Sequence, residues 1–149
     1  MTNLRQMVHT ALRDDSSLRT LVGNTTTTPY NVYREDPPVP FDFTSQAMVV
    51  WHFLANTPTL PSSHGVSMRQ REQVFAVTAY SADPDAVDNI LARVRIIFED
   101  LKAVTLPSAG AEVVACHFED EGPDLFDAEK KVKYRAVQFR IHYREDFTS

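Results

Sequence analysis

A strand that runs directly into a long helix, near the middle of the chain, most constrains the fold. Residues 74–80 (VFAVTAY) are rich in β-branched and aromatic side chains, which indicates a strand. Asp83 can cap the helix that follows, and Pro84 suits a first helical position, which needs no backbone N–H. Seven large apolar side chains then share one helical face, at positions 87, 90, 91, 94, 97, 98 and 101. This pattern predicts the main core helix, packed on a sheet.

Apolar spacing on both sides of this unit predicts further elements. A stripe with i, i+3, i+4 spacing over residues 4–12 predicts an N-terminal helix, and a short second helical turn should end at Gly23. Residues 31–34 predict a short edge strand, and residues 112–118 predict a longer strand. Residues 47–55 (AMVVWHFLA) predict a strand with two apolar faces, so we expect both faces to be covered, by a helix layer or by another subunit.

The last predicted strand, residues 132–143, carries a break in its apolar alternation. Its apolar side chains are even-numbered up to Ala136 and odd-numbered from Val137 onward. A β-bulge between these two residues would restore a single inward face. The side chains then expected to point outward are Lys133, Arg135, Gln138, Arg140, His142 and Arg144.

These elements predict a single α+β domain over residues 1–149, a length that suits one domain with its own core. We expect a mostly antiparallel sheet of four to five strands, packed against the long helix and the N-terminal helix in the order α-β-β-β-α-β-β. Two loops should project from it. Residues 56–68 are rich in Pro, Ser and Gly, and residues 119–131 are strongly acidic.

Composition limits the classes of protein to which this chain can belong. The net charge of −5 argues against a general nucleic-acid binder. A lone cysteine, Cys116, excludes an internal disulfide and suits a reducing cytoplasm. No apolar run approaches the roughly 20 residues of a membrane span, so we expect no membrane association. The charges spread through the N-terminus indicate a structural segment rather than a targeting signal.

The residues that could carry chemistry do not form a catalytic pattern. The five histidines lack metal-ligand spacing. Cys116 and His117 are neighbours in a predicted strand, so their side chains point to opposite faces. Residues 62–65 (SSHG) lack the strained turn that frames a nucleophilic serine. The acidic loop lacks the residue spacing of a calcium-binding loop. We therefore expect no catalytic, cofactor or metal site.

Two charged segments leave their role open. The acidic loop is either solvated or a partner for basic residues of a neighbouring molecule. The basic residues of the last strand form either a solvated face that limits aggregation, a set of salt bridges between subunits, or a surface for DNA or an acidic partner. The first two readings of the basic residues are favoured, because no exposed aromatic residues alternate with them.

Five stretches, in this order, resemble the tail-terminator (tail-completion) proteins of long-tailed bacteriophages. They are SSLRTLVG (16–23), NVYREDPPVPFDF (31–43), AMVVW (47–51), the strand-to-helix stretch REQVFAVTAYSADPDAVDNILARVRIIFEDL (71–101) and VQFRIHYRE (137–145). The resemblance covers most of the chain. The long loop 56–68 and the acidic insertion depart from the family pattern, which keeps open a role as a head–tail joining or minor tail protein.

The resemblance implies a structural protein and not an enzyme. Proteins of this family form a hexameric ring that caps the tail tube, stops its growth and presents a face to the head connector. The implied partners are further copies of the chain, the tail tube protein and the head–tail connector protein, with DNA passing through the lumen without being read. The implied location is the tail or neck of a virion assembled in the host cytoplasm.

Candidate residues for subunit or partner interfaces come from the apolar strand, the two loops and the basic strand. They are Trp51, Phe53, Leu60, His64, Met68, Glu119, Asp120, Glu121, Asp124, Lys133, Arg135, Arg140 and Arg144. The competing hypothesis is a small α+β enzyme or ligand-binding domain. It predicts a concave pocket with convergent polar groups near His52 or His117.

Overall fold

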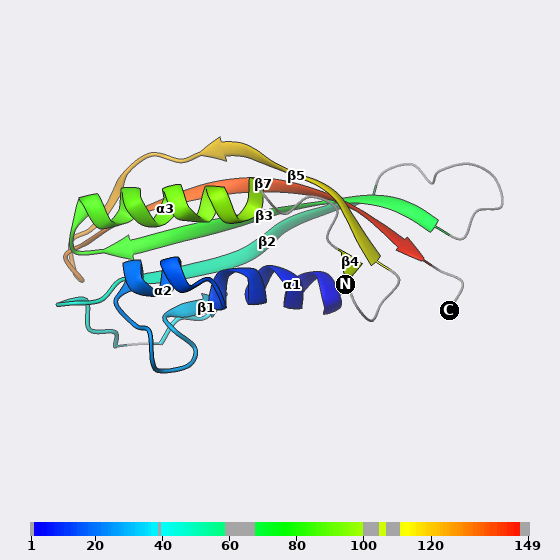
Figure 1. Ribbon diagram of the computed structural model, residues 1–149. Helices are drawn as coiled ribbons and strands as arrows, with labels where there is room; N and C mark the ends of the chain where they lie inside the picture. The colour runs from blue at the N-terminus through cyan, green and yellow to red at the C-terminus, as the bar shows by residue number, and fades with distance from the viewer. Residues whose placement is uncertain (1, 39, 59–67, 100–104, 107–110, 147–149) are drawn as a thin grey trace.

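The computed structural model describes residues 2–38, 40–58, 68–99, 105–106 and 111–146 (Figure 1). In this part of the chain the elements follow one another as α1 (Thr2–Arg13), α2 (Ser16–Val22), β1 (Val32–Arg34), β2 (Met48–Pro58), β3 (Met68–Ser81), α3 (Pro84–Glu99), β4 (Thr105–Leu106), β5 (Ala111–Glu121), β6 (Leu125–Asp127) and β7 (Val132–Asp146). The direct passage from a strand into the long helix, predicted from the sequence, is confirmed in β3 and α3.

The described strands form one sheet in the order β1-β2-β3-β7-β5-β4, and β6 also pairs with β7. β1 runs parallel to β2, and the other pairings are antiparallel. The α+β class with a mostly antiparallel sheet is therefore confirmed. Two strands were not predicted: β4 has two residues, and β6 has three and lies in the segment read as an acidic loop.

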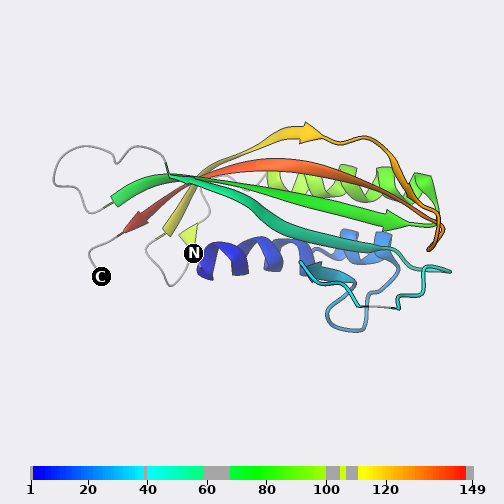
Figure 2. The ribbon, with the colours of Figure 1, turned by 180° about the vertical axis from the view of Figure 1, so that it is seen from behind.

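The three described helices cover the same face of the sheet, as Figures 1 and 2 show from opposite sides. Their buried side chains join those of the strands in one hydrophobic cluster. At its centre the ring of Phe75 in β3 lies 5.5 Å from that of Phe139 in β7 and 4.9 Å from that of Phe98 in α3. All three rings are fully buried. Burying one such ring stabilises a fold by about 1.5–3 kcal/mol relative to leaving it exposed.

Asp15 fixes the start of α2 and joins this helix to α3. Its carboxylate accepts a hydrogen bond from the Leu18 N–H at 2.9 Å, which caps the helix. The guanidinium of Arg93 in α3 donates to both carboxylate oxygens, at 2.9 and 2.7 Å. The hydrogen bond from Arg93 is the main reason that the pKa of Asp15 is lowered from its usual value, although burial opposes the shift.

Asn31 positions the edge strand β1 against the start of β2. This residue is buried and has a φ of 60°, a conformation that asparagine adopts more readily than most residues. Its amide nitrogen donates to the Ala47 carbonyl and to Gln46 Oε1, each at 3.0 Å. Its Oδ1 accepts a hydrogen bond from the Asn24 amide at 3.0 Å. The Val49 N–H donates to the Asn31 carbonyl at 2.9 Å, which begins the parallel pairing of β1 with β2.

The opposite face of the sheet carries no helix in the described part of the chain (Figure 2). Met48, at one end of this face, is still only 2% exposed, and residues 40–44 line a hollow together with it. Leu54, further along β2, is 46% exposed. A helix layer thus covers one face of the strand that we expected to be covered on both faces. Cover of the second face by another subunit stays a prediction.

The β-bulge predicted near Ala136 and Val137 in the last strand is absent. β7 pairs with β3 without interruption, from Lys133 opposite Ser81 to Asp146 opposite Met68. The apolar alternation changes because Val132 is buried on the face without helices, whereas Val137 and Phe139 are buried under the helix layer. Of the side chains expected to share an outward face, Lys133 and Arg135 lie on the helix face, and Gln138, Arg140 and His142 lie on the other face. The side chain of Arg144 lies outside what the structure describes.

Replacing Phe75 with alanine should lower the free energy of unfolding by about 3–5 kcal/mol, because it leaves a cavity among three packed rings. Urea denaturation followed by circular dichroism measures this change. Phe126→Ala is the matched control, since this ring is 59% exposed and its loss should cost less than about 0.5 kcal/mol. Equal effects of the two substitutions would contradict the packing described above.

Replacing Asp15 with asparagine should destabilise the fold at neutral pH and leave it almost unchanged in acid. Asparagine keeps the helix cap but removes the charge that faces Arg93. The folded-state pKa of Asp15 is lowered, so its charge stabilises the fold above the unfolded value of 3.8, and this contribution is lost as the pH falls through the folded-state pKa. We expect a difference of about 1–3 kcal/mol at neutral pH that shrinks progressively as the pH falls below 3.8, measured by denaturation from neutral to acidic pH. A difference independent of pH would contradict this assignment.

Candidate interaction surfaces

Arg135 gathers three carboxylates at the end of the sheet where α3 begins. Its guanidinium nitrogens lie 2.7 Å from Asp88 of α3, 2.7 Å from Glu121 of β5 and 2.8 Å from Asp124 of the following turn. The Arg135 side chain is 14% exposed, because it points toward the helix layer and not away from it as predicted. The cluster joins β7, α3 and the acidic segment.

Arg140 gathers a second group of charges on the face without helices. Its guanidinium lies between Glu72 of β3, with which it forms a close ion pair, and Glu119 of β5, at 2.7 Å. His142 Nδ1 lies 3.7 Å from the other oxygen of Glu72, and the rings of His142 and His117 are 5.2 Å apart. Acidic and basic residues that the sequence offers as partners for a neighbouring molecule thus pair within one chain. Whether they also contact a neighbour stays a prediction.

The remaining predicted interface residues lie in different settings. Trp51 is fully buried in the core, where its indole N–H donates to His9 Nδ1 at 3.0 Å. Phe53 is partly buried beside it, with a ring distance of 5.4 Å. Asp120 and Lys133 are exposed. Two more, Met68 and Arg144, belong to the backbones of β3 and β7. Leu60 and His64 lie outside the described residues.

Two exposed apolar residues on β6 were missed by the sequence analysis. Leu125 and Phe126 are 46% and 59% exposed, in the middle of the segment read as an acidic loop. The sequence signal that could have revealed this surface is a pair of large apolar residues among carboxylates.

Tyr33 of β1 contributes to a second surface at the opposite edge of the sheet. Its ring lies 6.4 Å from that of Phe41, which is 4.7 Å from that of Phe43.

Two open hollows lie among the described residues, and neither is where the enzyme hypothesis predicts a pocket. One has a volume of about 380 Å³ and is lined by Phe41, Phe43, Met48 and the pair Lys130 and Lys131, among others. The other, of about 510 Å³, lies beside the segment from Gly23 to Pro29. His52 and His117 line neither hollow.

No group of three or more His, Cys, Asp or Glu side chains in the described part of the chain is arranged to hold a metal ion. None of the described helices has both the length and the apolar character needed to cross a membrane. Burial raises the pKa of the Cys116 thiol to about 12, so this side chain is a neutral core residue at physiological pH.

The fold is similar to that of a chain in the solved virion of a native gene transfer agent (GTA) particle. The likeness covers 92% of this chain and 91% of that chain, with a TM-score of 0.64 and a sequence identity of 17%. At this identity the likeness shows a shared fold. The sequence matches no protein-family model and no curated protein.

Replacing Arg135 with alanine should destabilise the fold by about 1–2 kcal/mol, because three carboxylates lose their common partner. The cost stays moderate because those carboxylates are 47–77% exposed and water screens their repulsion. Thermal and urea denaturation measure the change. Lys133→Ala, two residues away and exposed, is the control and should change stability by less than about 0.5 kcal/mol. An Arg135→Ala variant as stable as this control would show that the cluster is dispensable.

Proposed function

We propose that this protein is a structural component of a phage-like virion, and that it acts as the tail terminator, a ring that caps the tail tube and joins it to the head connector. The fold shared with a chain of the GTA virion carries the proposal, because the likeness extends over nine-tenths of both chains. The order of sequence motifs resembling the tail-terminator family supports the finer assignment.

Features of the subunit suit a ring. One face of the sheet carries no helix in the described part of the chain (Figure 2). The large apolar side chains of Leu125 and Phe126 are exposed at a sheet edge. Apolar surface of this kind commonly marks a protein–protein contact. In a closed ring, each subunit buries such surface against its neighbours.

The proposal includes the partners and the location of the ring. Its partners are further copies of this chain, with about six subunits in the ring, the tail tube protein and the head–tail connector protein. DNA passes through the lumen without sequence-specific contacts, consistent with the acidic net charge of −5. The protein resides in the tail or neck of the virion, is assembled in the host cytoplasm and performs no catalysis.

A head–tail joining protein or a minor tail protein is the alternative within the same structural class. The shared fold is compatible with each of these roles. They differ in what the ring contacts, since a terminator binds the end of a tail tube and stops its growth. Adding the purified protein to growing tail tubes separates the roles: a terminator fixes tube length, and a joining protein leaves tube growth unchanged.

The purified protein should form rings of about six subunits at micromolar concentration without any ligand. Closure through repeated identical contacts is the physical reason, because each added subunit buries the edge left open by the previous one. Negative-stain electron microscopy combined with native mass spectrometry measures ring shape and subunit number. A monomer at tens of micromolar that also fails to bind tail tubes would overturn the proposal.

A further inference from the structure

We infer that one edge of the sheet docks against the opposite edge of a second copy of this chain. The first surface is the β6 edge, made of Leu125, Phe126 and the acidic residues of the segment 119–129. The second is the β1 edge, made of Tyr33, Arg34, Phe41, Phe43 and Arg13. The inference rests on the proposed ring-forming function and names the two surfaces that build the ring.

The β6 edge presents apolar side chains on an open strand. Among the described strands β6 pairs with β7 alone, so its other side is free to receive another strand. Leu125 lies opposite Tyr134 and points to the face without helices, whereas Phe126 points to the helix face. Exposed apolar edge strands are rare in proteins that stay monomeric, because they can pair with another chain.

The β1 edge offers a matching arrangement on both faces of the sheet. Tyr33, on the face without helices, forms an aromatic cluster with Phe41 and Phe43. Arg34 is exposed and lies opposite Trp51, which places it on the helix face. Among the described strands β1 pairs with β2 alone. It therefore also has one open side.

Strand direction permits the two edges to meet. β2 and β7 point the same way, since each is antiparallel to β3. β1 runs with β2, and β6 runs against β7. Continuing the sheet from one copy into the next therefore places β6 antiparallel to β1, the more stable pairing. In that arrangement Leu125 approaches the aromatic cluster of the neighbour, and Phe126 approaches its Arg34.

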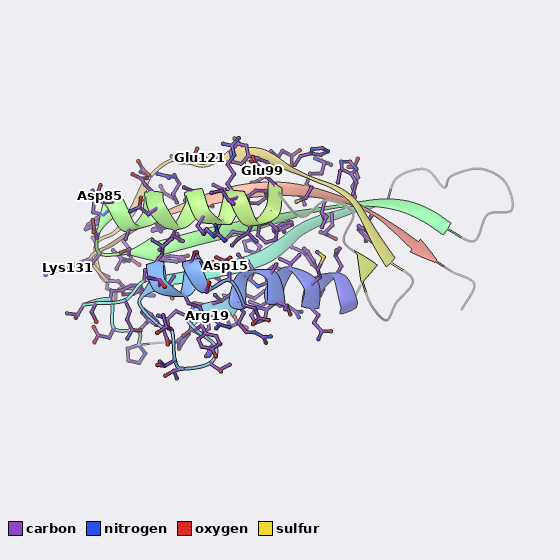
Figure 3. All side chains as sticks on the ribbon, in the orientation of Figure 1. Asp15, Arg19, Asp85, Glu99, Glu121 and Lys131 are labelled. Carbon is purple, nitrogen blue, oxygen red and sulfur yellow. The ribbon has the colours of Figure 1, made fainter. Side chains whose placement is uncertain are left out.

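The β6 edge is acidic, and the β1 edge has mixed charge with an exposed arginine, Arg34, that can meet it. Residues 119–129 contain six carboxylates and no basic residue, whereas the β1 edge carries Arg13 and Arg34 together with the neighbouring Glu35, Asp36 and Asp42. Figure 3 shows Glu121 on one side of the molecule and Arg19 on the other. Lys133 lies opposite Phe126 and reduces the negative charge of the β6 edge without cancelling it. A carboxylate of the β6 edge placed against Arg34 orients the encounter of two copies.

Two arginines of the β1 edge act on His9, and Asp14 opposes them. The pKa of His9 is lowered first by burial and then by the charges of Arg13 and Arg34. Both guanidiniums therefore lie close enough to act on the same imidazole. Arg13 pairs with Asp14, whereas Arg34 has no ion-pair partner among the described residues. Arg34 is thus available to a carboxylate, or to the ring of Phe126, on a neighbouring copy.

Contact between two different surfaces is head-to-tail, and repeated head-to-tail contacts close into a ring when the rotation between copies permits.

Two single variants test the contact between the β6 edge and the β1 edge. Phe126→Arg sets a cation against the arginines of the neighbour, and Arg34→Glu sets an anion against its carboxylates. Each should reduce the assembly to monomers, measured by size-exclusion chromatography with light scattering. Mixing the two variants in equal amounts should restore the assembly, because contacts then alternate between native edges and newly opposite charges.

Ile96→Arg is the matched control, since Ile96 is 49% exposed on α3, away from both edges, and the variant should assemble like the wild type. Leu125→Lys gives a second substitution on the β6 edge, and circular dichroism checks the folding of each variant. If both single variants still form rings, or if mixing does not restore assembly, the inference is overturned and the ring-forming function stands. A wild-type protein that stays monomeric at tens of micromolar overturns both.

Discussion

The contact between Phe75, Phe98 and Phe139 is the interaction on which the rest of the structure depends. It joins the two central strands, β3 and β7, to the long helix through three buried rings. Because α3 packs on this face, α2 can reach it through Asp15 and Arg93, and the helix layer is confined to one side of the sheet. The other face of the sheet carries no helix among the described residues, and the ion pairs of Arg140 lie on it.

The parts of the fold that the sequence predicts well are those with strong local periodicity. The strand 74–80 and the helix after it carry their own start signals, so their order and contact follow directly. The last strand was misread, because alternation reports which side chains are buried but not which layer buries them. Val132 is 1% exposed on the face without helices, and Val137 is 3% exposed beneath the helices. A single continuous strand satisfies both, with no bulge.

The charged residues show why the candidate surfaces were harder to predict. Arg140 pairs with Glu119, which is 21 positions away in sequence, and with Glu72, which is 68 positions away. These pairs form because β7 lies between β5 and β3 in the sheet. Segment composition identifies which residues carry charge, but strand order decides which of them meet. Phe126 was overlooked because it stands among carboxylates, in a segment whose composition indicates an acidic loop.

The Arg135 cluster has a consequence for the energetics of assembly. Its ion pairs attach the turn before β6 to α3 and to the end of β5, so this part of the acidic segment takes its shape when the subunit folds. A loop that becomes ordered only on contact loses conformational entropy at that moment, which weakens binding. In this protein the conformational entropy of the segment before β6 is lost when the subunit folds. The β6 edge is therefore pre-organised before a partner binds. A rigid subunit can then associate without waiting for a rearrangement.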